Sequence, residues 1–184
     1  QLEKIWKQLY KLAKKIKQSH FEPEVIIGIS RGGLLVARFL SDLLENPNVV
    51  IFGIGFYKGI NDTKDQPIIT QELTADIKDK IILLVDDVAD TGKSLELALD
   101  YLKEKGAKQI KIATLHYKPH SIIKPEFYIK ETSNWVVYPW EYTEFTRLVY
   151  KREQEKATPE QLQEQLVAIG IPKEVIEIVI KEKE

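Results

Sequence analysis

The chain contains no cysteine, three histidines and no long apolar run, and each shortage excludes a class of protein. Without cysteine there is neither a disulfide framework nor thiolate chemistry, and three histidines, of which one is far from the other two in the sequence, do not predict a histidine metal site. No run is long enough to cross a bilayer, and the N-terminus lacks the apolar region of a signal peptide, so we expect a cytoplasmic protein without a membrane partner. A net charge of −1 predicts no nucleic-acid partner.

What remains is typical of a globular α/β protein. The 184 residues are 43% hydrophobic and 30% charged, enough for one domain with a full core and an appendage. Short β-branched runs predict strands, and stretches with apolar residues at helical spacing predict the helices between them. We therefore predict a central, mainly parallel sheet flanked by helices. Strands are expected over residues 24–29, 49–57, 68–73, 81–85 and 109–117, and helices over 1–19, 34–46 and 94–106.

The most informative stretch is residues 80–94, KIILLVDDVADTGKS. An apolar strand is followed by three acids and a small polar loop, and a helix begins directly afterwards. Thr91 and Ser94 offer hydroxyls, Gly92 allows a close backbone approach, and the helix start favours an anion, so the loop suits a phosphate. The last three residues of this stretch but one position, GKS, match the end of a Walker A motif. Asp87 stands where that motif requires its first glycine, so the stretch is not a P-loop.

This stretch resembles the phosphoribosyl-pyrophosphate (PRPP) signature of type I phosphoribosyltransferases. The competing interpretation is an ordinary strand-to-helix turn with solvated acids, which does not require three acids, Thr-Gly and a hydroxyl together. The resemblance implies an enzyme whose signature loop binds PRPP and its 5′-phosphate. The implied residues are Asp86, Asp87, Ala89, Asp90, Thr91, Gly92, Lys93 and Ser94.

The resemblance also implies roles for the acids. Asp86 and Asp87 would hold the ribose hydroxyls and orient the cofactor Mg²⁺, with Glu141 as a further acid near the metal. Asp90 would be catalytic, because the family uses this acid to take or hold the proton on N7 of a purine.

A second glycine-bearing turn follows the strand over residues 24–29. In the resembling enzymes Ser30, Arg31, Gly32 and Gly33 would form the pyrophosphate loop, often with a cis peptide, here between Ser30 and Arg31. Arg31 would be catalytic because its permanent charge grips and stabilises the leaving group. The alternative is a plain turn with an exposed arginine.

A polar segment over residues 58–67 separates two further predicted strands. In the family a mobile loop at this place closes over PRPP and excludes water, and Tyr57 and Lys58 are its candidate residues here. The alternative is a surface hairpin.

Base recognition is expected from two places. Lys118 follows the strand over 109–117, where the purine enzymes carry a lysine that reaches the 6-position. Two short segments, 127–130 and 134–138, are expected to form a hairpin that leads to the base-binding hood, in which Trp135 would stack on the purine and the main chain of Val136 would read its edge. The alternatives are a solvated lysine and a core tryptophan.

From residue 140 the pattern becomes helical, with helices expected over 140–156, 158–170 and 172–183. We therefore expect a phosphoribosyltransferase core with hood over residues 1–139 and a three-helix tail over 140–184. The tail is similar to that of crenarchaeal adenine phosphoribosyltransferases, whose core resembles the 6-oxopurine branch, and an archaeal origin would fit.

The predicted function is a purine phosphoribosyltransferase of purine salvage. It would convert PRPP and a purine base into a nucleoside monophosphate and pyrophosphate, and the family usually forms homodimers. The tail favours adenine, which would give AMP, whereas Lys118 favours a 6-oxopurine (hypoxanthine, guanine or xanthine) because an ammonium donates and cannot accept. A non-catalytic PRPP-sensing regulator is a further alternative, and the Trp135 hood disfavours an orotate enzyme.

Overall fold

The computed structural model describes residues 2–57 and 66–181 and divides the chain into two compact units. Residues 5–133 form the larger unit, which contains the sheet, and residues from Asn134 onward, with the first residues of the chain, form the smaller one. No helix in the described part of the chain is both long and apolar enough to span a membrane.

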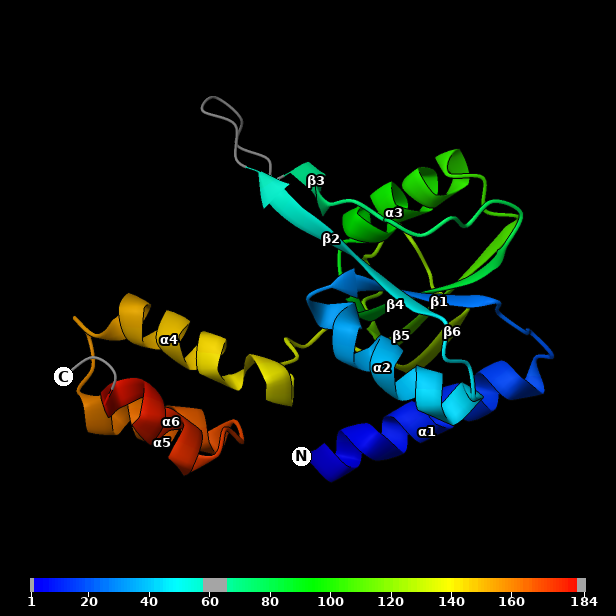
Figure 1. Cartoon of the computed structure of the whole chain (residues 1–184). Helices are drawn as coiled ribbons and strands as arrows, with labels where there is room; N and C mark the ends of the chain where they lie inside the picture. The colour runs from blue at the N-terminus through cyan, green and yellow to red at the C-terminus, as the bar shows by residue number, and fades with distance from the viewer. Residues whose placement is uncertain (1, 58–65, 182–184) are drawn as a thin grey trace. The chain divides into compact units, whose positions relative to one another are not determined.

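The larger unit is built on a six-stranded sheet with the order β3-β2-β1-β4-β5-β6. All neighbouring pairs are parallel except β2 and β3, which are antiparallel and form one edge (Figure 1). The prediction of a mainly parallel sheet is therefore confirmed. The strands are β1 (Val25–Ser30), β2 (Val49–Tyr57), β3 (Gln66–Gln71), β4 (Ile81–Ala89), β5 (Gln109–Tyr117) and β6 (Phe127–Glu131).

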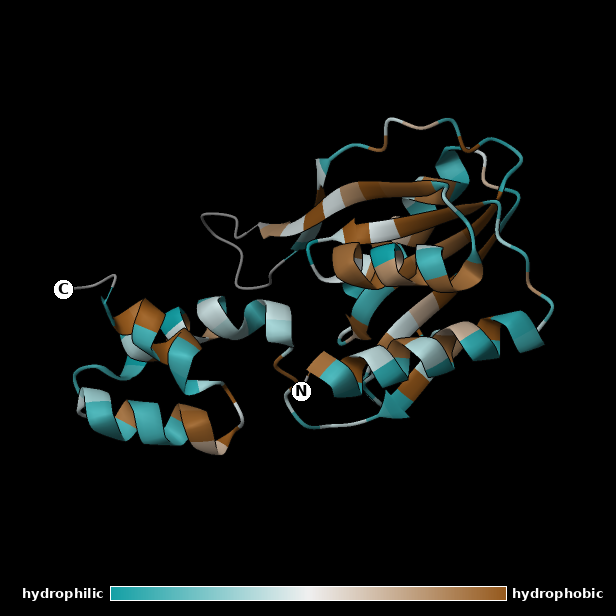
Figure 2. Cartoon of the chain, turned by 60° about the horizontal axis from the view of Figure 1, so that its bottom comes forward, coloured by the Kyte–Doolittle hydropathy of each residue, from teal (hydrophilic) through white to brown (hydrophobic). Residues whose placement is uncertain are grey.

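Helices cover both faces of this sheet. Helices α1 (Leu2–Gln18) and α2 (Gly32–Leu44) lie on one face and α3 (Lys93–Glu104) on the other, as Figures 1 and 2 show from two directions. Such three-layer packing explains why the central strands are apolar on both sides and are drawn mostly brown in Figure 2.

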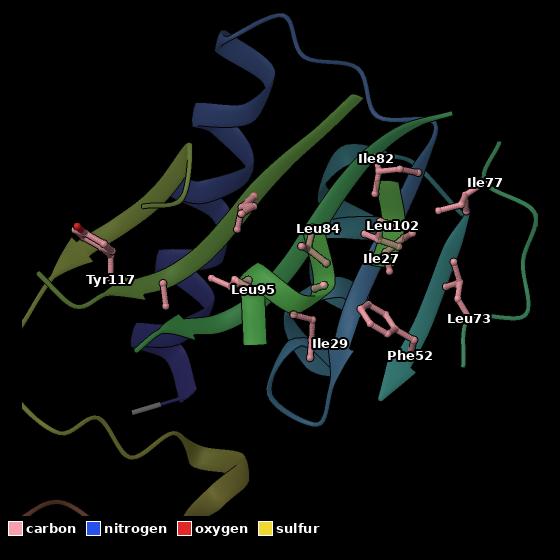
Figure 3. Close-up of a cluster of buried hydrophobic side chains, with 13 residues drawn as sticks. Ile27, Ile29, Phe52, Leu73, Ile77, Ile82, Leu84, Leu95, Leu102 and Tyr117 are labelled. Carbon is pink, nitrogen blue, oxygen red and sulfur yellow. The ribbon is translucent and has the colours of Figure 1, made fainter. Parts of the chain in front are cut away.

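The sheet residues alternate between the two helical layers, as the two-residue period of a strand requires. On the α3 side, Ile27 and Ile29 of β1 and Leu84 of β4 pack with Leu95 and Leu102 of the helix (Figure 3). All five side chains are at most 4% exposed, so this cluster forms the core that fixes the ends of β1 and β4.

The smaller unit is helical. It contains a 3₁₀ turn η1 (Pro139–Glu141) and helices α4 (Tyr142–Glu153), α5 (Pro159–Ala168) and α6 (Lys173–Lys181). Helix α5 begins with a capping box, in which Thr158 Oγ1 accepts from Gln161 N and the Gln161 side chain accepts from Thr158 N. A separate cluster of buried side chains holds the unit together: Tyr142, Tyr150, Leu162, Leu166, Ile171 and Ile176.

The predicted hairpin of residues 127–130 and 134–138 was wrong. The first segment is β6, which joins the main sheet in parallel beside β5, and the second is irregular. Tyr128 lies against Tyr117 of β5, with ring centroids 5.2 Å apart, so side-chain packing favours the sheet edge. The second segment runs into Pro139, where a capping box between Tyr138 and Glu141 starts the 3₁₀ turn instead.

Candidate active site

The candidate site lies where the direction of chain winding changes. From β1 the chain crosses through α2 to β2, and from β4 it crosses through α3 to β5 on the opposite side, although β1 and β4 are neighbours. The carboxyl ends of β1 and β4 therefore form the topological switch point of the sheet, the place where open α/β proteins bind ligands. Both glycine-bearing turns identified in the sequence lie there.

Strand β4 continues further than predicted. It was expected to end at Val85, but its pairing with β5 extends to Ala89, so Asp86 and Asp87 lie within the strand rather than in a loop. Pairing with β1 stops at Gly28 and Val85. The two acids therefore begin where β4 loses its β1 neighbour.

The turn after β1 fills the place beside these acids. A Cβ added to Gly32 would lie 2.6 Å from the carboxylate atoms of Asp87, and one added to Gly33 would overlap the carbonyl oxygen of Val85. Glycine is thus required at position 33 because its backbone contacts the backbone of β4, and a side chain at position 32 would displace the Asp87 carboxylate. The Asp87 side chain, only 5% exposed, is held against the turn, and Asp86 Oδ1 accepts from Asp87 N at 2.9 Å.

The peptide bond between Ser30 and Arg31 is cis, as predicted. Arg31 follows it as an exposed residue at the start of α2. Arg31 thus stands at the switch point and directly precedes Gly32 and Gly33, the order expected of a pyrophosphate loop.

The signature loop leads directly into α3. Gly92 has a φ of 84°, a left-handed conformation, and precedes the first helical residue, Lys93. Gly92 has no side chain to cap this helix, and Lys93 N makes only a long contact, 3.4 Å, to Thr91 Oγ1. The N–H groups of the first turn have no intrahelical partner and favour an anion. Thr91 is exposed and Ser94 half-buried, and both hydroxyls are in the same short segment.

A second loop, residues 118–123 after β5, is attached to the signature loop. Lys118 N donates to Ala89 O at 2.9 Å, and Ile122 N donates to Thr91 O at 3.0 Å. Between these two bonds, His120 Nε2 lies 3.1 Å from Asp90 Oδ1. His120 was not among the predicted site residues, although its position two residues after Lys118 on the same edge was the available signal.

The structure brings together the predicted residues of the two loops, and Lys118, the predicted base-binding residue of the larger unit, lies beside the signature loop. Lys118 is buried, 5% exposed, and its Nζ lies 3.5 Å from Ser133 O. Trp135, which is 74% exposed, and Val136 belong to the smaller unit, so their roles stay predictions.

Three other predicted residues also stay predictions. Tyr57 ends β2, and Lys58 lies outside the described residues. Glu141 belongs to the smaller unit, where its Oε2 accepts from Tyr138 N at 3.1 Å and so caps the 3₁₀ turn.

The acids at the switch point suit a magnesium ion that is held partly by substrate. Within residues 2–57 and 66–181, no group of three histidine, aspartate or glutamate side chains is arranged to hold a metal ion. Mg²⁺ commonly binds one or two carboxylates and completes its shell with water and substrate phosphate oxygens. Asp86 and Asp87 fit that pattern, and they do not form an all-protein cage.

A glycine-bearing loop between a strand and a helix, at the switch point of a mainly parallel sheet, is the arrangement in which open α/β proteins bind nucleotides and sugar phosphates. Within that class, a sequence profile of the phosphoribosyl transferase domain matches residues 1–144. The chain belongs to this phosphoribosyltransferase family.

Solved structures and curated relatives agree with this family. The purine phosphoribosyltransferase of Pyrococcus horikoshii is 41% identical, with a TM-score of 0.65, over 73% of this chain and 86% of that one. A xanthine-guanine-hypoxanthine phosphoribosyltransferase of Helicobacter pylori is 26% identical, with a TM-score of 0.67, over 80% and 95% of the two chains. The hypoxanthine-guanine phosphoribosyltransferase of Mycoplasma genitalium is 33% identical over 107 residues, which are 55% of this chain and only 57% of that protein.

Proposed function

We propose that this protein is a purine phosphoribosyltransferase, which transfers the 5-phosphoribosyl group of PRPP to a purine base and releases pyrophosphate. The observation that carries the proposal is the meeting of two loops at the switch point. The Arg31 turn approaches Asp87, and the Thr91–Ser94 turn opens α3. Family membership and the similarity to purine enzymes support the same reaction.

The residues at the switch point match the charges of the reaction. The first-turn N–H groups of α3, with Thr91 and Ser94, bind the 5′-phosphate, and Asp86 and Asp87 bind the ribose hydroxyls. The bond from C1′ to pyrophosphate loosens as the bond from C1′ to the base forms. Arg31 stabilises the charge that develops on the leaving group. A bound Mg²⁺, held in part by the acids of β4, would supply further charge neutralisation.

Asp90 is the general base of the proposed reaction. It follows β4 directly, and its side chain is 47% exposed, so a ligand can reach its carboxylate. It takes or holds the proton that the imidazole ring of the purine loses. Removal of a positioned base lowers turnover by about 10²- to 10⁴-fold.

We expect Asp90→Asn to retain PRPP binding, measured by isothermal titration, while its kcat falls within that range. Asp100→Asn, at an exposed position of α3 whose carboxylate pairs with Lys103, is the matched control and should keep full activity. Near-normal turnover of Asp90→Asn would refute the role of Asp90.

For the base, we propose a 6-oxopurine rather than adenine. The relatives described above are named for hypoxanthine, guanine or xanthine where their names state a base. Lys118 supports this choice because an ammonium group can donate to an oxygen at the 6-position but not to an amino group. The helical tail is the observation that favours adenine.

The deciding experiment offers adenine, hypoxanthine, guanine and xanthine separately with PRPP and Mg²⁺, and measures nucleotide formation. Conversion of the oxopurines, and its loss in Lys118→Met, would support Lys118 as the selector. Lys124→Met is the control, since Lys124 is an exposed lysine nearby in the chain. Conversion of adenine alone would overturn the base assignment and leave the reaction class intact.

The remaining expectations stay predictions of the same proposal. They are a homodimer, an archaeal origin, a cytoplasmic location and the domain boundary after residue 139. The PRPP-sensing regulator is distinguished by the same assay, because it would bind PRPP and turn over none of the four bases.

A further inference from the structure

Successive contacts join the loop after β5, residues 118–123, to the signature loop. Ala89 O, the Asp90 carboxylate and Thr91 O receive contacts from Lys118 N, His120 Nε2 and Ile122 N in that order. The pairing of β4 with β5 ends at Ala89 and Tyr117, so these contacts continue the attachment of the two chains beyond the sheet.

The signature loop packs tightly against the second loop at Gly92. A Cβ on Gly92 would lie 2.6 Å from Ser121 Oγ and 2.7 Å from Ile123 N. Ser121 Oγ in turn donates to Ile123 O at 2.8 Å, which holds the second loop in its own bend. The backbones of both loops are thus fixed relative to each other on either side of the Asp90–His120 contact.

Within this frame the Asp90 side chain has one described hydrogen-bonding partner, the imidazole of His120. An ionised carboxylate only accepts hydrogen bonds, so His120 must carry its proton on Nε2 and donate it to Oδ1. A half-exposed aspartate without this contact would sample several rotamers in water. With Oδ1 engaged, the carboxylate has a fixed orientation and Oδ2 remains for a ligand.

We propose that His120 is a positioning residue for Asp90, which holds the carboxylate in the orientation needed to accept the purine proton. The inference rests on the proposed function, because it assigns to Asp90 the role of general base. It adds a residue that acts through Asp90 and does not itself contact the reacting atoms.

Substitution of His120 isolates this role because the side chain is 60% exposed and belongs to no core cluster among the described residues. Glutamine carries a donor nitrogen at about the reach of Nε2, whereas asparagine is one bond too short. We expect His120→Asn to lower kcat about tenfold, a part of the whole contribution of a positioned base. His120→Gln should restore kcat to within about threefold of the wild type. Both variants should keep the thermal midpoint and PRPP affinity of the wild type.

The double variant provides the decisive comparison. If His120 acts only through Asp90, His120→Asn has no further effect in the Asp90→Asn background, because residues that act as a unit are not additive. His20→Asn is the control, since His20 is an exposed histidine with a φ of 55°, a conformation that asparagine tolerates. It should leave kcat unchanged.

Each outcome of these assays either supports or overturns the positioning role of His120. Three results would overturn the positioning role and leave the proposed function standing. They are normal turnover of His120→Asn when the wild type is active, a kcat of His120→Gln as low as that of His120→Asn, and an equal loss of kcat from His120→Asn in the wild-type and Asp90→Asn backgrounds. A wild-type protein that converts no purine would overturn the proposed function, and the role with it.

Discussion

Two glycines with the same backbone conformation make it possible to separate local strain from damage to the site. Gly92 in the signature loop and Gly106 after α3 both have a φ of 84°. Alanine in a left-handed conformation costs about 1–2 kcal/mol relative to its preferred conformation. Gly92→Ala and Gly106→Ala therefore share this penalty, and any further difference comes from the space around each residue.

The surroundings of the two glycines differ sharply. At Gly106 the nearest atom to an added Cβ is Lys78 Cγ at 3.3 Å, part of a flexible side chain. At Gly92 the added atom would lie 2.7 Å from the backbone nitrogen of Ile123, which cannot move alone. Overpacking of this kind costs about 1–3 kcal/mol. We expect Gly106→Ala to lose about 1–2 kcal/mol and Gly92→Ala about 2–5 kcal/mol of unfolding free energy.

Urea denaturation followed by circular dichroism measures this difference, and enzyme assays measure its functional side. Displacement of residues 118–123 would move Lys118 and His120 away from the signature loop. A misplacement of about 1 Å can cost 10²-fold in rate, so kcat/KM should fall by about this factor in Gly92→Ala. Gly106→Ala should keep wild-type activity. Equal stability losses in the two variants, or full activity in Gly92→Ala, would refute the close attachment of the two loops.

Three further predictions concern stability. The Ile81 N–H and then the Lys80 ammonium lower the pKa of Glu24 below its ordinary value. The unfolded chain therefore binds this proton more readily, so the stabilisation by Glu24 is present above the ordinary pKa and is lost as the pH falls through the folded value. Thermal midpoints of the wild type and Glu24→Gln should converge in acid, and a constant gap would contradict this origin. Leu84→Ala, at a fully buried position, should lower the unfolding free energy in urea by about 2–5 kcal/mol, and a loss below 1 kcal/mol would mean that the core collapses around it. Tyr150→Phe removes the hydroxyl that donates to Pro159 O at 3.1 Å and should cost the helical unit about 1 kcal/mol, seen as faster amide exchange in α4 and α5; unchanged exchange would contradict it.

Strands with a strong apolar run were predictable because local composition and sheet packing favour the same state. β2 and β5 have the predicted bounds, and β1 and the three sheet-covering helices differ by a few residues at their ends. The end of β4 was not predictable from composition, since Asp86 and Asp87 disfavour a strand. Pairing with β5 keeps them extended, and that pairing depends on residues far away in the sequence.

The parts of the site that lie within the two glycine-bearing motifs could be predicted from the sequence. Both glycine turns lie at the switch point, and the cis peptide is present where it was expected. The contact of His120 with Asp90 was not predicted, because no local pattern reveals which loop lies beside a given strand end. The same limit applies to residues 134–138, where β-branched residues suggested a strand but Pro139 and the capping box start a 3₁₀ turn.

The position of the site at the junction of β1 and β4 has a consequence for folding kinetics. Val25 pairs with Ile82, so this junction closes a loop that contains α2, β2 and β3. Contacts between such distant segments form slowly, because the entropy of a long loop is lost before the contact repays it. The binding surface therefore exists only after this long-range pairing is complete. A ligand that binds there binds only chains in which β1 and β4 are paired, so it stabilises the assembled sheet by mass action.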